Sequence, residues 1–87
     1  MEKSLFSKEY DLFLQQLRAG REDAGLTQAQ LAERLAATQS WVSKCERGER
    51  RLDIVEVRTW CRALGISFPA FATQFESILS RKRNRRS

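Results

Sequence analysis

The stretch TQSWVSKCERGERR, residues 38–51, gathers the side chains with the most obvious capacity for chemistry. It combines amide, hydroxyl, ammonium and guanidinium groups around one tryptophan, a set suited to binding a polar and charged partner. The chain contains no histidine. The commonest general base is therefore absent, and neither a Ser-His nor a Cys-His pair can form. We expect a binding protein and not an enzyme.

Cys45 and Cys61 are the only cysteines, and they are sixteen residues apart. Without a histidine or a C-x-x-C pair, their spacing fits neither a zinc site nor a disulfide framework. We expect both to be small buried apolar side chains, and we expect no metal and no cofactor.

The composition indicates one small soluble domain. The chain has 87 residues, of which 41% are hydrophobic and 31% charged, and no apolar run approaches the roughly 20 residues of a membrane-spanning helix. The N-terminus MEKSLFSKEYDLFL lacks the apolar stretch and cleavage site of a signal peptide. These features predict a cytoplasmic protein that does not enter a membrane.

The positive charge is concentrated at the C-terminus. Five of the 16 Lys and Arg residues lie in RKRNRR, residues 81–86, and the remaining 11 balance the 11 acidic residues. This segment has no apolar residue to bury, so we expect a folded domain over 1–80 and a basic disordered tail over 81–87. The tail would attract phosphates without choosing a sequence.

Capping signals divide the domain into helices. Thr27 with Gln30, and Asp53 with Glu56, match the capping box that opens a helix. Three glycines stand where left-handed residues would end helices, namely Gly25, Gly48 and Gly65. With the apolar periodicity of the flanking segments, these signals predict an all-α fold with helices over 8–24, 28–36, 39–47, 54–64 and 68–80.

The segment 28–47 is predicted to be a helix-turn-helix. Its two helices are joined by about three residues, which forces them to cross steeply, and Ala32 is small enough to allow a close approach. In the second helix Val42 and Cys45 fall on one side and Trp41 on the boundary. The opposite side carries hydroxyls and cations, from Ser40, Ser43, Lys44 and Arg47.

That polar side has two interpretations, a solvated surface or a surface that binds DNA. Three features favour DNA: the short turn, the absence of an acidic residue from the polar side, and the arginines Arg50 and Arg51 in the following loop. In this geometry a second helix can enter the major groove while loop cations meet the neighbouring phosphates.

The segment from Leu17 to Ser67 resembles the phage-repressor, Cro and Xre-type helix-turn-helix family. The resemblance is carried by GLTQAQLA, by a polar-start helix ending in ERGERR, and by RALGIS. It implies a compact five-helix lambda-repressor-like domain in a bacterial or phage-infected cell. It also implies a dimeric transcriptional regulator, a repressor of a near-palindromic operator in double-stranded DNA.

The resemblance assigns roles to residues of this chain. It implies base contacts from Gln39, Ser40 and Lys44, to which the boundary position of Trp41 adds a fourth candidate. It implies a structural ion pair between Arg21 and Glu46. Phosphate contacts are implied for Gln28, Ser43, Arg47, Arg50 and Arg51.

Three points stay open from the sequence. Ala36 stands where many family members carry glycine, so the turn is expected to differ locally or to hold a left-handed alanine. The dimer candidates Trp60, Phe75, Ile78 and Leu79 could equally close the core. The alternative function is an antitoxin that neutralises a partner toxin and autoregulates its operon, or a restriction-modification controller protein.

Overall fold

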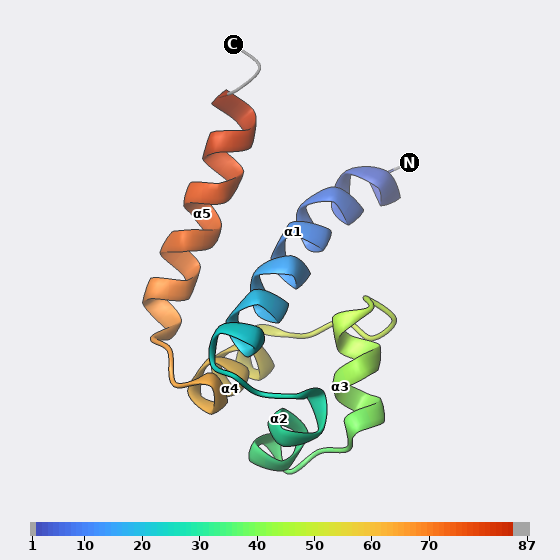
Figure 1. Ribbon diagram of the computed structural model, residues 1–87. Coiled ribbons are helices and arrows are strands. Elements are labelled where there is room, and N and C mark those ends of the chain that lie inside the picture. Colours follow the sequence, from blue (N-terminus) through green and yellow to red (C-terminus); the bar gives the residue numbers. More distant parts are fainter. Residues whose placement is uncertain (1, 85–87) are drawn as a thin grey trace.

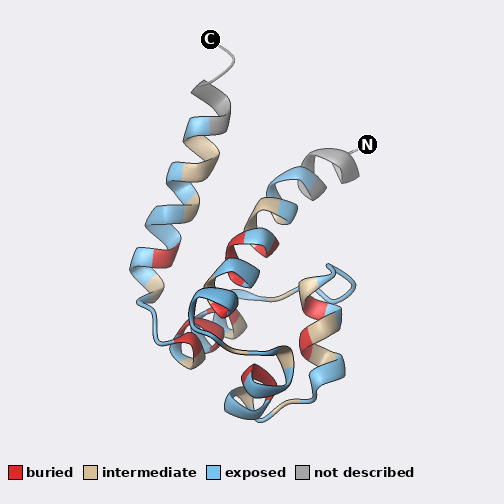
Figure 2. Ribbon diagram, in the orientation of Figure 1, coloured by how far each residue is buried: buried red, intermediate tan, exposed pale blue. Residues whose placement is uncertain are grey.

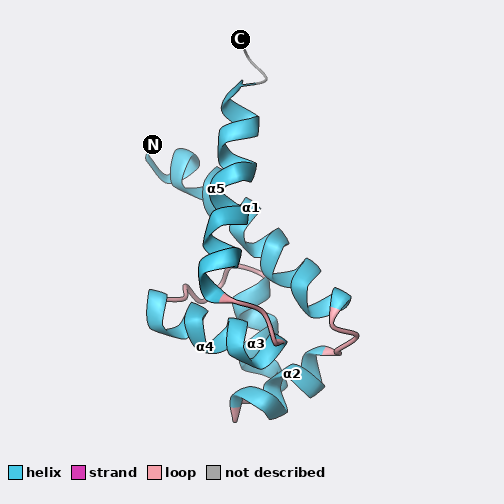
Figure 3. Ribbon diagram, turned by 90° about the vertical axis from the view of Figure 1, so that its left-hand side faces the viewer, coloured by secondary structure: helices cyan, strands magenta, loops and turns pink. Residues whose placement is uncertain are grey.

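Five helices make up the described chain (Figure 1). The computed structural model describes the backbone of residues 2–84 and the side chains of residues 8–81. No strand occurs within that range (Figure 3), so the predicted all-α fold is confirmed. The helices are α1 (Glu2–Asp23), α2 (Gln28–Leu35), α3 (Gln39–Glu46), α4 (Ile54–Leu64) and α5 (Phe68–Asn84).

Both capping boxes form and fix the first residues of α2 and α4. The Thr27 hydroxyl accepts from the Gln30 N–H at 3.0 Å, and the Gln30 side chain accepts from the Thr27 N–H at 2.9 Å. Asp53 and Glu56 make the equivalent reciprocal bonds at 2.8 and 2.9 Å. Each box pairs N–H groups that the first turn of a helix leaves without an intrahelical partner. The two helices therefore begin where the sequence predicts.

The turn between α2 and α3 contains a left-handed alanine. Ala36 has φ 55° and ψ 42°, and its N–H donates to the Glu33 carbonyl at 3.2 Å. It is the only non-glycine residue with positive φ in the described chain. The glycines predicted to end helices, Gly25, Gly48 and Gly65, also have positive φ. The turn thus keeps a geometry that favours glycine, at an energetic cost carried by Ala36.

The two terminal helices are longer than predicted. α1 begins at Glu2 and not at Lys8, because no glycine or proline interrupts the segment before Lys8. α5 continues to Asn84, so the disorder predicted from residue 81 differs from the structure over 81–84. Arg and Lys have high intrinsic helix propensity, which favours continuation of the helix into this segment. Residues 85–87 of the predicted tail lie outside the described residues.

Each helix contributes to one core (Figure 2). α2, α3 and α4 gather at one end of the molecule, and α1 and α5 extend from it (Figure 1). No helix of the described chain is long and apolar enough to span a membrane. The buried apolar residues are Leu14, Leu17, Leu31, Ala32, Val42, Cys45, Val57, Trp60, Cys61, Leu64 and Phe71.

The two cysteines are free and buried, as predicted. Removal of the thiols from water raises the pKa of Cys45 to about 11 and raises that of Cys61 as well. Both therefore remain neutral apolar side chains at physiological pH.

Candidate nucleic-acid interface

α2 and α3 pack on each other through their apolar sides and form a helix-turn-helix. Leu31 and Ala32 of α2 are buried, as are Val42 and Cys45 of α3. Thr38 caps α3, because its hydroxyl accepts from the Trp41 N–H at 3.0 Å. The cap sets the first turn of α3 and hence the direction in which its first side chains leave the helix.

The outward side of α3 is polar and basic. Gln39, Ser40, Lys44 and Arg47 are exposed, and Ser43 is half-buried. The one acidic residue of α3, Glu46, does not reach this surface, because its side chain is only 4% exposed. The surface that α3 presents to solvent is therefore free of acidic side chains.

Glu46 is held by Arg21 of α1 in a bidentate ion pair. The Nε–Oε2 distance is 2.7 Å and the Nη2–Oε1 distance is 3.0 Å. Arg21 also donates to the Leu26 carbonyl at 2.9 Å, and its side chain is 9% exposed. The hydrogen bond from Arg21 to Glu46 raises the pKa of the guanidinium. The pair fastens α3 to α1 with both charges withdrawn from solvent.

A chain of amide hydrogen bonds links this ion pair to the start of α3. The Gln28 Nε2 donates to Glu46 Oε1 at 3.0 Å, and the Gln28 Oε1 accepts from Gln39 Nε2 at 3.5 Å. Since Glu46 can only accept, it fixes which end of the Gln28 amide faces Gln39. The structure thereby brings together Arg21, Gln28, Gln39 and Glu46, four residues from three helices.

Trp41 packs at the edge of the core. It is half-buried, and its ring lies 5.8 Å from that of the fully buried Trp60. The guanidinium of Arg50 lies 5.3 Å from the centre of the Trp41 ring, within cation–π range. Trp41 therefore supports the α3–α4 loop as well as the core.

The loop arginines engage partners within the chain that the sequence did not suggest. Arg50 makes a bidentate pair with Glu56 at 3.0 and 3.2 Å. Arg51 lies 4.1 Å from the ring centre of Tyr10, whose hydroxyl accepts from the Leu52 N–H at 3.0 Å. Glu56 was identifiable from its place in a capping box. Tyr10 was not, because no local signal connects it to a loop that lies 42 positions away.

Glu49 is a further residue that the sequence did not single out. Its carboxylate pairs with the Arg47 guanidinium at 2.9 and 3.2 Å, and Arg47 also donates to the Ser43 hydroxyl. The hydrogen bond from Arg47, followed by its charge, lowers the pKa of Glu49. Arg47 and Glu49 are both about half exposed.

A family model described as a helix-turn-helix domain matches residues 12–70. An XRE-family like protein from Pseudomonas syringae pv. tomato is 39% identical, with a TM-score of 0.82 over 88% of this chain and 94% of that one. The chain belongs to the Xre-type helix-turn-helix family. The clp gene regulator ClgR from C. glutamicum is 26% identical, with a TM-score of 0.69 over 79% of this chain and 90% of that one. No curated protein gives a significant match.

In this Xre-type domain the four dimer candidates have different environments. Trp60 is fully buried, so it closes the core and has no surface to offer a second subunit. Phe75 packs edge-on against Phe13 with ring centres 6.0 Å apart and is half-buried. Ile78 and Leu79 are also half-buried. The last three remain candidates on the basis of their partial exposure.

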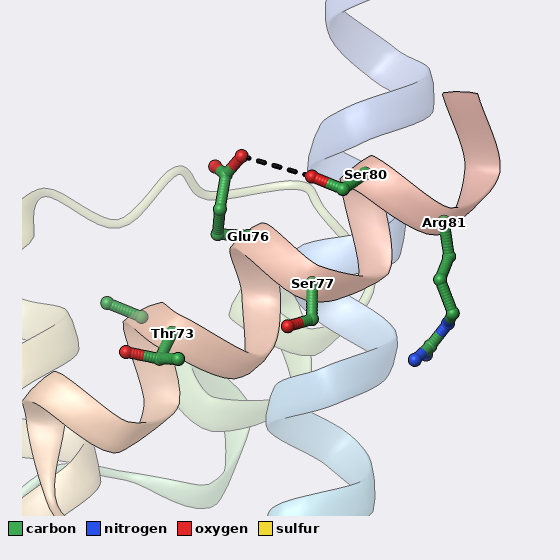
Figure 4. Close-up of a pocket in the computed structure, with 6 residues that line it drawn as sticks. Thr73, Glu76, Ser77, Ser80 and Arg81 are labelled. Atoms are coloured by element: carbon green, nitrogen blue, oxygen red, sulfur yellow. Dashed lines mark hydrogen bonds between the residues drawn. The ribbon is translucent and has the colours of Figure 1, made fainter. Parts of the chain in front are cut away.

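A shallow pocket with a mixed polar and apolar lining runs along α5. It is lined by Ala72, Thr73, Glu76, Ser77, Ser80 and Arg81 (Figure 4), and Ser80 donates to Glu76 at 3.3 Å. No group of three or more potential metal ligands occurs among the described residues. The site with organised chemistry is thus the outward side of α3 and its adjoining loop.

Proposed function

We propose that this Xre-type regulator is a sequence-specific DNA-binding protein that acts as a homodimeric repressor on a near-palindromic operator, in the cytoplasm of a bacterial or phage-infected cell. The observation that carries the proposal is the composition of the α3 surface. Gln39, Ser40 and Lys44 are exposed, while the one carboxylate of the helix is withdrawn by Arg21. Such a surface can approach the anionic major groove without like-charge repulsion.

We assign base contacts to the first two turns of α3. An amide such as that of Gln39 can pair in a bidentate manner with adenine, and the ammonium of Lys44 can donate to guanine. Ser40 would contact either, and the exposed edge of Trp41 would meet a thymine methyl. Phosphate contacts are assigned to the N-terminus of α2 at Gln28 and to Ser43, Arg47, Arg50 and Arg51.

A homodimer would give this small domain enough contact with DNA. One α3 reads only a few base pairs, so a two-fold pair would place two such helices in successive major grooves, about 34–36 Å apart. The half-buried Phe75, Ile78 and Leu79 are the proposed contacts between subunits. The cations of segment 81–86 would add sequence-independent attraction to phosphates.

Substitution of Gln39 tests this proposal. On an operator selected from random DNA, Gln39→Ala is expected to cost about 1–3 kcal/mol of discrimination against random duplex, because one base is no longer read. Fluorescence anisotropy titrations on both duplexes measure the ratio of the two affinities. Gln15→Ala, which removes an exposed glutamine from α1, is the matched control. An equal ratio for Gln39→Ala, Gln15→Ala and wild type would contradict the assignment.

A further inference from the structure

Arg47 already holds an anion in the free protein. Its Nε and Nη2 bind the two carboxylate oxygens of Glu49 at 2.9 and 3.2 Å, and its Nη1 binds the Ser43 hydroxyl. This side-on fork is the same set of donors that a guanidinium offers to two oxygens of a phosphate. Glu49 and a phosphate therefore cannot both occupy the fork of Arg47.

The neighbouring pair, Arg50 with Glu56, has a different character. Glu56 also accepts from the Asp53 N–H in the capping box of α4, and its side chain is 28% exposed. Arg50 lies over the Trp41 ring. That pair therefore also supports the loop and the first turn of α4, in addition to the phosphate contact assigned to Arg50. The Arg47–Glu49 pair, with side chains 54% and 55% exposed, stands in solvent at the end of α3.

Glu49 stays ionised under physiological conditions and lies among cations. Its pKa is lowered by the hydrogen bond from Arg47, by the charge of Arg47 and, to a lesser extent, by Lys44. Its backbone N–H donates to the Lys44 carbonyl at 2.9 Å, which fixes the loop beside the last turn of α3. Glu49 thus places a negative charge next to the cations assigned to DNA.

We propose that Glu49 is an affinity-setting residue that competes with DNA phosphate for Arg47. This inference rests on the proposed DNA binding. In the free protein the Glu49 carboxylate is paired with the Arg47 guanidinium. When DNA binds, a phosphate takes the place of this carboxylate. A phosphate contact carries no sequence information. Glu49 therefore weakens binding to operator and to random DNA by the same factor and leaves the ratio of the two affinities unchanged.

The size of the effect follows from the exposure of the pair. Exposed ion pairs of this kind shift an equilibrium by up to about fivefold. Glu49→Gln keeps the size of the side chain and removes its charge. It is expected to tighten binding to both duplexes by about two- to fivefold. The slope of log affinity against log salt concentration should also become steeper by up to about one. In this variant Arg47 neutralises a phosphate without first giving up the Glu49 carboxylate.

Four variants of the full chain test the proposal by anisotropy titration on the selected operator and on a random duplex. They are Glu49→Gln, Arg47→Gln, the double variant, and Glu22→Gln as the matched control. Glu22 makes an exposed ion pair with Arg18 on α1, with side chains 57% and 64% exposed. Glu22→Gln removes one negative charge, as Glu49→Gln does, and likewise leaves an exposed arginine without its carboxylate partner. At physiological salt we expect it to change affinity by less than about 1.5-fold, because screening limits the reach of a remote charge.

The expected result is a gain for Glu49→Gln on both duplexes that disappears in the Arg47→Gln background. An equal gain in that background, or an equal gain for Glu22→Gln, would overturn the proposal in favour of a general charge effect. A change in the ratio of the two affinities would overturn it by making Glu49 a reader of bases. If the wild-type chain binds DNA and Glu49→Gln binds with the same affinity, this inference alone is overturned. No wild-type binding to either duplex would overturn the proposed function and, with it, this inference.

Discussion

Glu46 is the one acidic residue of the helix assigned to DNA, and its burial decides what that helix presents. Its side chain is 4% exposed and is neutralised by Arg21. Glu46→Ala would leave the Arg21 guanidinium buried without its partner, a change that typically costs about 3–5 kcal/mol. We predict a loss of this size in the free energy of unfolding, measured by urea denaturation.

The matched control for that prediction is Glu22→Ala. It breaks the Arg18–Glu22 pair, whose atoms are 3.3 Å apart and whose side chains are mostly exposed. Exposed pairs contribute less than about 1 kcal/mol. If Glu46→Ala loses no more than Glu22→Ala, then the Arg21–Glu46 pair does not hold α3 to α1.

At the scale of single residues, the sequence predicted the contacts between residues that lie close together in the chain. The Thr27 and Asp53 capping boxes join residues three positions apart, and their bonds form as expected. The Arg21–Glu46 pair joins residues 25 positions apart. Only the family resemblance suggested it, because no spacing rule connects α1 to α3. The sequence does not predict the Arg47–Glu49 pair, because its two charges are near neighbours in an exposed segment where many pairings are possible.

At the scale of elements, the turn between α2 and α3 carries a cost that one substitution can remove. A left-handed alanine is strained by about 1–2 kcal/mol, a cost that glycine does not have. Glycine, however, loses more conformational entropy on folding than alanine does, which costs about 0.5–1 kcal/mol. Ala36 has φ 55°. We predict that Ala36→Gly raises the free energy of unfolding by about 0.5–1 kcal/mol in urea denaturation.

Ala37→Gly is the control for the turn. Ala37 is adjacent to Ala36 but has no positive φ, so glycine there should only increase the entropy lost on folding and lower stability. Equal destabilisation by the two substitutions would show that the left-handed geometry at Ala36 carries no strain.

The sequence predicted inner helix ends better than outer ones. α4 occupies Ile54–Leu64 as expected, because Asp53 caps its start and Gly65 ends it. α1 and α5 exceed their predicted ranges at Glu2 and Asn84, where no cap or glycine marks a boundary. Their lengths there depend on helix propensity, which is a weak signal. The contact between α2 and α3 was predictable because only residues 36–38 separate the two helices.

At the scale of the molecule, the charges separate into two parts with different roles. The body carries balanced charge, and its basic character on α3 comes from the withdrawal of Glu46 and not from an excess of cations. The net charge of +5 comes from segment 81–86, beyond the core-forming part of α5. In the proposed account the body chooses the sequence, and the C-terminal cations strengthen attachment to any DNA.

Selection of binding sites from random double-stranded DNA tests the central claim most directly. The full chain should enrich one near-palindromic site, with half-sites whose centres lie about 34–36 Å apart or a multiple of that distance, since each subunit of a two-fold dimer places one α3 in the major groove. Enrichment of no site would contradict the account.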